Sequence, residues 1–420
     1  MSERNHLIDL ARVLSVLIVV VFHTLLWTVG IGEDGVTVVP WAPGPAWWAI
    51  SWVATIVPIF FVAAGYANAV VVDTWRATAR PYSVFLTLRG SRLLGPLSVA
   101  MIMFTTVGTL AAWAGWTAQA VTLSRQFAQL FWFAVVYQLL LAAAPLAVWL
   151  QDRWGGWVMV PLLAGAIAVD VAVRITGDLG LQWVALAFVW PLAHQLGIAY
   201  HRGWFRAWPA PAVLALLAGC AGVIAILVFG LDYPPSAVAW ADVLVANLLP
   251  PTLAILVLGV AQTCVLALLE QAGLARRLSP TASGFIRVAN ALLLTVYLWQ
   301  IPAIVVGAAI LVGLAWDWPT AAPILLSQGV LVVLVLVLVV VSVPWIARLD
   351  LRFVPRPGPG IPHPGWAEAG YALFAAGTFA VWQCGAVLHL ASPASIAAVL
   401  TYATGALILR RATHSTQDSA

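Results

Sequence analysis

The stretch ARVLSVLIVVVFH, residues 11–23, lies in the first long apolar run of the chain, which covers about residues 10–30. As a helix, this run is long enough to cross the roughly 30 Å of hydrocarbon in a lipid bilayer. It nevertheless carries Arg12 at one end and His23 eleven positions later. Ionisable side chains at membrane depth are energetically costly, and by default they indicate a functional site.

The composition of the whole chain predicts a membrane protein. Of its 420 residues, 63% are hydrophobic and only 8% are charged. A soluble protein of this length could not bury that much apolar surface. The net charge is only +4 and the arginines are scattered over short connections, which argues against nucleic-acid binding. The cysteines Cys220, Cys264 and Cys384 lack the spacing of metal ligands, so we expect no metal site.

Twelve apolar segments are long enough, or nearly so, to be transmembrane helices, and the connections between them are short. The sequence therefore predicts an all-α, polytopic transmembrane helix bundle of about twelve spans. The expected spans are residues 10–30, 48–72, 93–116, 127–150, 157–174, 181–200, 210–230, 243–269, 288–313, 322–347, 369–390 and 393–410. We expect a transmembrane domain over residues 1–347, a proline-rich cytoplasmic linker over 348–368, and a C-terminal helical pair with its tail over 369–420.

The distribution of arginine predicts how the chain is oriented in the membrane. The chain has no lysine, and sixteen of its 19 arginines fall on the same side as the N-terminus if the spans alternate. Arg125 and Arg174 fall on the other side, and Arg12 lies within the first span. Cytoplasmic loops of membrane proteins are enriched in basic residues. We therefore expect a multi-pass protein of the cytoplasmic membrane with both termini in the cytoplasm.

Arg12 and His23 share one face of the expected first helix. Eleven residues at about 100° each make three turns plus roughly 20°, and they rise by about 16 Å. The two side chains cannot contact each other, but a ligand of that length could contact both. Asp9 precedes Arg12 by three positions, so these two residues can pair. The alternatives are that Arg12 extends to the lipid headgroups and that His23 makes an ordinary hydrogen bond inside the bundle.

Two further segments place polar side chains in or near the membrane. Tyr66 follows Gly65 in VPIFFVAAGYANA, residues 57–69, where ordinary helix packing also explains the glycine. Arg89 and Arg92 are three positions apart, so they lie on one face at the start of the third span. Such a pair can clamp a phosphate group, or it can anchor the helix in the headgroup region.

Together these segments resemble the membrane acyltransferase-3 family. Asp9, Arg12 and His23 are similar to the opening signature of that family, and PIFFVAAGY, residues 58–66, to its second-helix motif. The arginine pair matches a pair at its third helix. Similarity continues in Trp132-Phe133, in WPLAHQLGIAYHRGW, residues 190–204, and in TVYLWQIP, residues 295–302. The matches occur in order over about residues 4–345.

The resemblance implies an integral-membrane O-acyltransferase with a ten-helix core, to which the last two helices are an addition. Such enzymes commonly transfer an acyl group from cytoplasmic acyl-CoA to a hydroxyl of a saccharide, lipid or other envelope or secondary-metabolite acceptor. It implies His23 as the general base, Asp9 and Arg12 as further catalytic residues, and Arg89 and Arg92 as ligands of the donor. The side chains that we expect to contact the substrate are Tyr66, Trp132, Tyr297 and Gln300.

The implied partners are the lipid bilayer, acyl-CoA and a hydroxyl-bearing acceptor, with no tightly bound cofactor; no segment specifies an oligomeric state. Two other functions remain open. A transporter or flippase of the same substrate class would also carry polar side chains in its spans, although no inverted repeat is visible. The second possibility is a catalytically inactive member of the family. It is suggested by Gln300, which occupies the position of a late histidine in the family motif. Glutamine cannot carry a proton at neutral pH.

Overall fold

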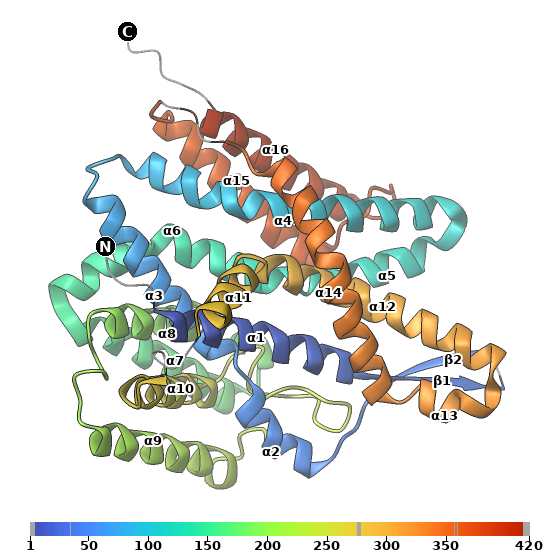
Figure 1. Cartoon of the computed structure of the whole chain (residues 1–420), viewed down its shortest axis with the longest axis horizontal. Coiled ribbons are helices and arrows are strands. Elements are labelled where there is room, and N and C mark those ends of the chain that lie inside the picture. Colours follow the sequence, from blue (N-terminus) through green and yellow to red (C-terminus); the bar gives the residue numbers. More distant parts are fainter. Residues whose placement is uncertain (1–4, 34, 275–278, 357, 359, 415–420) are drawn as a thin grey trace. The chain divides into compact units, whose positions relative to one another are not determined.

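A computed structural model of the chain describes residues 5–33, 35–274, 279–356, 358 and 360–414, which are almost entirely helical (Figure 1). Among the arginines counted for the orientation, Arg4, Arg276 and Arg277 lie outside the described residues. The helices and strands are α1 (His6–Leu25), β1 (Trp27–Gly32), β2 (Gly35–Pro40), α2 (Pro45–Ala54), α3 (Val57–Arg76), α4 (Tyr82–Ala111), α5 (Thr117–Ala128), α6 (Phe131–Trp154), α7 (Met159–Thr176), α8 (Leu186–His201), α9 (Ala210–Ala225), α10 (Leu253–Gln271), α11 (Pro280–Ala291), α12 (Leu293–Asp317), α13 (Ala322–Leu325), α14 (Gln328–Phe353), α15 (Pro364–Cys384) and α16 (Pro393–His414).

Ten helical segments in the described part of the chain are long and apolar enough to cross a membrane. They confirm the prediction of an all-α, multi-pass membrane protein. The count differs from the twelve expected spans for two reasons. Phe131–Thr176 is one continuous segment that contains both α6 and α7, which were expected as separate spans, and α15 is not among the ten.

The first helix begins and ends earlier than the apolar run predicts, at His6 and Leu25 and not at residues 10 and 30. Its start is fixed by Asn5, whose side chain accepts hydrogen bonds from the amides of Leu7 (3.0 Å) and Ile8 (3.3 Å). The helix ends at Leu25, and the chain then forms the antiparallel hairpin β1–β2. In this hairpin β-branched residues surround a turn that ends in Gly35, a pattern that favours strands over helix.

The helix expected over residues 243–269 also begins later, at Leu253. Residues 243–252 form an irregular loop, in which the Asn247 amide donates to the carbonyl oxygen of Pro234 (2.8 Å). The two prolines at 250–251 lack the N–H donor that a helix interior needs. The buried carboxylate of Asp170 on α7 then accepts from the Leu253 amide (2.8 Å), which favours a helix start at that point.

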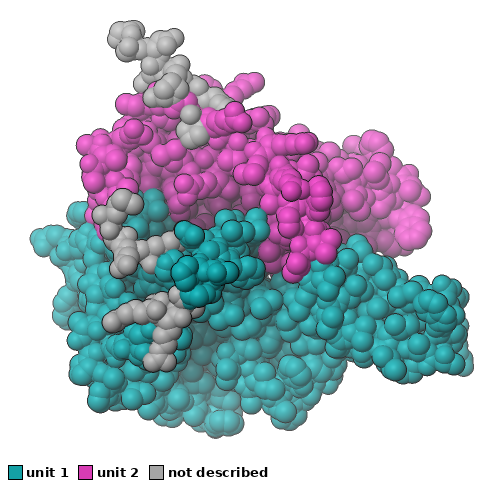
Figure 2. All heavy atoms as spheres, in the orientation of Figure 1, with its two compact units in different colours: residues 1–72, 144–293, 302–338 teal, residues 73–143, 294–301, 339–420 magenta. Residues whose placement is uncertain are grey.

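Contacts along the chain divide it into two units, coloured separately in Figure 2. Unit 1 consists of residues 1–72, 144–293 and 302–338, and unit 2 of residues 73–143, 294–301 and 339–420. Helices α3, α6, α12 and α14 contribute residues to both. Within unit 1, α10 packs against α8 and α9, and α1 packs against α11. Within unit 2, α15 and α16 pair with each other and both pack on α4.

In unit 1, α3 and α8 cross with their backbones in contact. A Cβ atom added at Gly65 would lie 1.9 Å from the carbonyl oxygen of His194, and one at Gly197 would lie 1.8 Å from that of Val62. The buried side chains of Asn68 and His194 form a hydrogen bond of 3.1 Å between the same helices. Small residues and interhelical hydrogen bonds are the usual means of close helix packing in membranes. The packing interpretation of Gly65 is therefore confirmed.

We expect Gly197→Ala to destabilise the protein, because the added methyl group forces α3 and α8 apart. Overpacking of this kind costs about 1–3 kcal/mol. Gly222 on α9 is the matched control, because nothing lies within 4 Å of a Cβ added there. Gly222→Ala should be neutral or slightly stabilising, since alanine is the better helix former. Thermal unfolding of both variants in detergent measures the difference, and equal unfolding midpoints would contradict the close crossing.

Candidate active site

Two of the residues expected to act in catalysis lie near the start of α1. Asp9 is buried, and its Oδ1 accepts a hydrogen bond from the Asn290 side chain of α11 (2.7 Å). The Arg12 guanidinium lies 5.3 Å from the centre of the Phe60 ring on α3, within the range of cation–π attraction. Neighbouring helices of unit 1 thus hold both side chains. The pairing of Asp9 with Arg12 stays a prediction.

His23 lies in the last turn of α1, and its Nδ1 is 2.9 Å from the carbonyl oxygen of Val19. A carbonyl oxygen can only accept, so Nδ1 carries the proton and the lone pair of the neutral ring is on Nε2. This tautomer is the one that can accept a proton at Nε2. The expected span of residues 10–30 placed His23 near mid-membrane. Because α1 ends at Leu25, the imidazole instead lies at the C-terminal end of the helix.

Tyr66 lies beside the C-terminal end of α8 in unit 1. Its ring meets the ring of His201 edge-on, with 5.1 Å between the centroids, and that of Tyr200 at 6.2 Å. The preceding residue is Gly65, so the close crossing of α3 and α8 is what brings these rings together. The position of Tyr66 is therefore fixed by packing one residue away.

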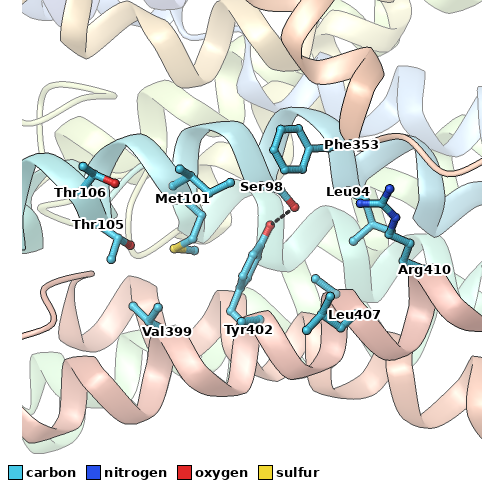
Figure 3. A pocket seen from close by; sticks show the side chains of 13 residues that line it. Leu94, Ser98, Met101, Thr105, Thr106, Phe353, Val399, Tyr402, Leu407 and Arg410 are labelled. Atoms are coloured by element: carbon cyan, nitrogen blue, oxygen red, sulfur yellow. Dashed lines mark hydrogen bonds between the residues drawn. The ribbon is translucent and has the colours of Figure 1, made fainter.

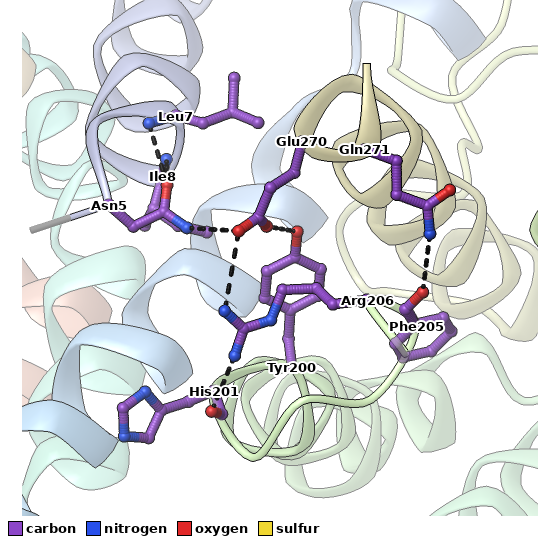
Figure 4. Close-up of polar contacts among 9 residues, drawn as sticks. All are labelled: Asn5, Leu7, Ile8, Tyr200, His201, Phe205, Arg206, Glu270 and Gln271. Atoms are coloured by element: carbon purple, nitrogen blue, oxygen red, sulfur yellow. Dashed lines mark hydrogen bonds and ion pairs between the residues drawn. The ribbon is translucent and has the colours of Figure 1, made fainter. Parts of the chain in front are cut away.

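Next to these rings, the Glu270 carboxylate at the end of α10 joins three parts of unit 1 (Figure 4). It accepts hydrogen bonds from the Tyr200 hydroxyl of α8 and from the Asn5 side chain (3.4 Å), which also caps α1. Arg206 forms an ion pair with the same carboxylate at 3.6 Å, and its guanidinium lies over the Tyr200 ring. Glu270 thereby connects the start of the helix that carries Arg12 and His23 to the ends of α8 and α10.

In unit 2, Arg89 and Arg92 lie three residues apart on α4 and therefore on one side of that helix. Arg89 is half-buried and Arg92 is exposed. Gly90 lies between them, and a Cβ added there would lie 2.9 Å from the Tyr371 ring of α15. The close approach of α15 fixes the rotation of α4, and with it the direction in which the two guanidinium groups extend.

Three residues expected to contact the substrate come together in unit 2. The Tyr297 hydroxyl donates to the carbonyl oxygen of Leu130 (3.0 Å), and its ring centre is 5.0 Å from that of Phe133. Trp132 meets the same Phe133 ring edge-on at 5.9 Å. Gln300 is fully buried, and its Nε2 donates to the carbonyl oxygen of Tyr297 (2.9 Å). Its Oε1 has no hydrogen-bond partner among the described residues.

A second buried glutamine, Gln138 on α6, is not singled out by the sequence pattern, because a lone glutamine in a transmembrane helix usually serves packing. Neither its Oε1 nor its Nε2 has a hydrogen-bond partner within the described ranges. Leaving a buried polar group unsatisfied costs about 1–3 kcal/mol. Such groups mark places where a water molecule or a ligand completes the hydrogen bonds. Gln138 is therefore an additional candidate for substrate contact.

The predicted site residues divide between the two units. Unit 1 contains Asp9, Arg12, His23 and Tyr66. Unit 2 contains Arg89, Arg92, Trp132, Tyr297 and Gln300. Over the described ranges, no group of three or more histidine, cysteine, aspartate or glutamate side chains is arranged to hold a metal ion.

Comparison with known proteins tests the resemblance seen in the sequence. The profile of the acyltransferase-3 family, described as an acyltransferase domain, matches residues 5–349. The chain belongs to this family. It is thus a multi-pass membrane acyltransferase, and α15 and α16 lie beyond the matched domain. Comparison with curated proteins and with solved structures gave no match.

The hydrogen bond between Tyr200 and Glu270 predicts a measurable coupling. Glu270→Gln and Tyr200→Phe should each destabilise the acyltransferase, and the double variant should lose less than the sum, because Tyr200→Phe removes and Glu270→Gln weakens the same charge-assisted hydrogen bond. Hydrogen bonds to charged groups contribute about 1.5–3 kcal/mol. Chemical denaturation in detergent gives the coupling. Glu33→Gln, in the exposed turn of the hairpin, is the control, and strictly additive effects would contradict the network.

Proposed function

We propose that this acyltransferase moves an acyl group from acyl-CoA to a hydroxyl of a saccharide, lipid or other envelope or secondary-metabolite acceptor. The observation that carries the proposal is the 2.9 Å contact between His23 Nδ1 and the Val19 carbonyl oxygen, which favours the neutral tautomer with its lone pair on Nε2. Arg12 lies on nearly the same face of α1, about 16 Å away along the axis. A pantetheine arm has a length of this order, so we propose that the arm of the donor runs along α1 from the level of Arg12 to His23.

In the proposed reaction, Nε2 of His23 takes the proton of the acceptor hydroxyl as its oxygen attacks the thioester carbonyl carbon. The C–O bond forms, the C–S bond breaks, and the departing thiolate takes the proton from His23. The products are the acyl ester and free CoA. General base catalysis of this kind contributes about 10²–10⁴-fold to the rate. Gln300 can hold a hydroxyl through its Oε1, but it cannot accept the proton.

The donor's phosphates are assigned to Arg89 and Arg92. Two guanidinium groups on one side of α4 can bind phosphate oxygens through paired, charge-assisted hydrogen bonds. The arginine distribution supports a protein of the cytoplasmic membrane with its N-terminus inside, which places this end of α4 at the cytoplasm. Acyl-CoA is made in the cytoplasm, so the donor would be taken from that side.

Loss of the base is the most direct test. We expect His23→Gln, which keeps a polar side chain, to lower transfer of labelled acetyl groups from acetyl-CoA into membrane products by about 10²–10⁴-fold. The KM for acetyl-CoA should change little, because the base acts in the chemical step. His363→Gln, in an exposed loop, is the matched control. A His23→Gln enzyme with near-normal kcat would remove His23 from the mechanism.

Loss of the donor ligands should change binding instead. We expect Arg89→Gln and Arg92→Gln each to raise the KM for acetyl-CoA by about 10- to 100-fold, as expected for the loss of a charge-assisted hydrogen bond. Arg153→Gln, at the exposed end of α6, removes the same charge elsewhere and should leave the KM unchanged. If all three variants behave alike, the arginines act only through the general electrostatic field.

A further inference from the structure

Unit 2 contains a cavity of about 360 Å³ between α4 and α16, with Phe353 at the end of α14 beside it (Figure 3). This volume falls in the ordinary range of small-molecule sites. The wall is mostly apolar. Arg410 lies at one end beside Leu94, the hydroxyls of Ser98 and Tyr402 meet in the middle at 3.2 Å, and Thr105 lies at the other end.

The helix that forms one wall is held firmly in place. A Cβ added at Gly377 of α15 would lie 2.3 Å from the backbone of Tyr402, and one at Gly405 of α16 would lie 2.2 Å from that of Phe374. The two C-terminal helices therefore touch along their backbones. Because α16 lies beyond residues 5–349, the matched domain alone does not form this cavity.

The cavity lies on a different side of α4 from the donor arginines. Its wall on this helix includes Leu94, Ser98, Met101 and Thr105, which recur at the spacing of a single helix face. At 100° per residue, Arg89 and Arg92 each lie about 150° from the middle of that face. The cavity is thus a separate feature of unit 2, and an inference about it does not depend on the acyl donor.

Length and charge identify the kind of occupant. From Leu94 to Thr105 the wall rises by about 16 Å along the helix axis. One lipid acyl chain fills about half of the roughly 30 Å hydrocarbon core, so the wall and an acyl chain have similar lengths. Arg410 supplies a positive charge at one end, and none of the carboxylates in the described part of the chain forms an ion pair with it. The hydroxyl pair of Ser98 and Tyr402 lies four residues from Leu94 on α4 and eight residues from Arg410 on α16, about 6 Å and 12 Å along the two helices, where it can meet the polar ester region of a lipid.

We propose that this cavity binds one acyl chain of an anionic membrane phospholipid, with the lipid phosphate at Arg410 and the chain extending toward Thr105. Guanidinium groups bind phosphate through charge-assisted hydrogen bonds, and burial of the methylene groups stabilises the chain. The bound lipid fills the space between α4 and α16. The C-terminal helical pair thus adds a lipid site to the acyltransferase domain.

Native mass spectrometry of the delipidated full-length protein tests this proposal. Titration with palmitoyl-oleoyl phosphatidylglycerol should show tighter binding than titration with the phosphatidylcholine of the same chains. Arg410→Gln should weaken phosphatidylglycerol binding by about tenfold or more and so remove the preference. Arg411→Gln removes the neighbouring charge, which does not line the cavity, and should leave the preference intact.

A second pair of variants tests binding of the lipid acyl chain, whereas the first pair tests binding of the charged headgroup. Ala406→Phe fills the cavity and should weaken binding of both lipids, whereas Ala397→Phe, on the exposed side of the same helix, should not. Phosphatidylglycerol with six-carbon chains should also bind more weakly, because fewer methylene groups are buried. The proposal is overturned if Arg410→Gln and Arg411→Gln have equal effects, if wild type binds both headgroups equally, or if Ala406→Phe binds like wild type.

Discussion

The hydrocarbon of a bilayer offers no hydrogen-bond partner, so each polar group inside it must be satisfied by the protein or by a ligand. This constraint explains why the chain is helical and why its buried side chains form pairs. Asn68 meets His194, Asn290 meets Asp9, and the Thr295 hydroxyl meets Asp350. Against this background the unsatisfied amide atoms of Gln138 and Gln300 stand out among the described residues. Those two glutamines are therefore candidates for hydrogen bonds to a substrate hydroxyl.

Much of the fold is predictable because the length of each apolar segment can be read directly from the sequence, without knowledge of which helices become neighbours. The runs that form α1, α3, α8 and α16 are visible in the sequence, and six motifs in order from α1 to α12 together indicate the family that the profile match shows. The predicted helix boundaries are wrong where the local preference for a strand or a turn competes with the preference for helix. Residues 27–30 are apolar enough to extend α1, but their β-branched neighbours and Gly35 favour a hairpin. Residues 243–252 fail as a helix because of the two prolines at 250–251 within them and the hydrogen bonds of Asn247.

The contacts around the candidate residues were far less predictable. The partner of Asp9 is Asn290, 281 positions away, and Glu270 meets Asn5 across 265 positions. No periodicity encodes such pairs, since they depend on which helices become neighbours. Gly65 and Gly197 were visible as small residues, but only the crossing of α3 and α8 shows that each faces a backbone carbonyl of the other helix. Residue types could therefore be predicted for the site, whereas their partners could not.

The hydrogen bonds that His23 and Gln300 make within their own helices indicate which of the two side chains can accept a proton. Each uses one nitrogen on its own helix: Nδ1 of His23 on the Val19 carbonyl, and Nε2 of Gln300 on the Tyr297 carbonyl. In the neutral ring Nε2 of His23 is the basic nitrogen, whereas Oε1 of Gln300 can accept a hydrogen bond but not a proton. A histidine in place of Gln300 would have supplied a second base. Under the proposed mechanism, proton transfer is therefore assigned to His23, because a glutamine at position 300 cannot take a proton.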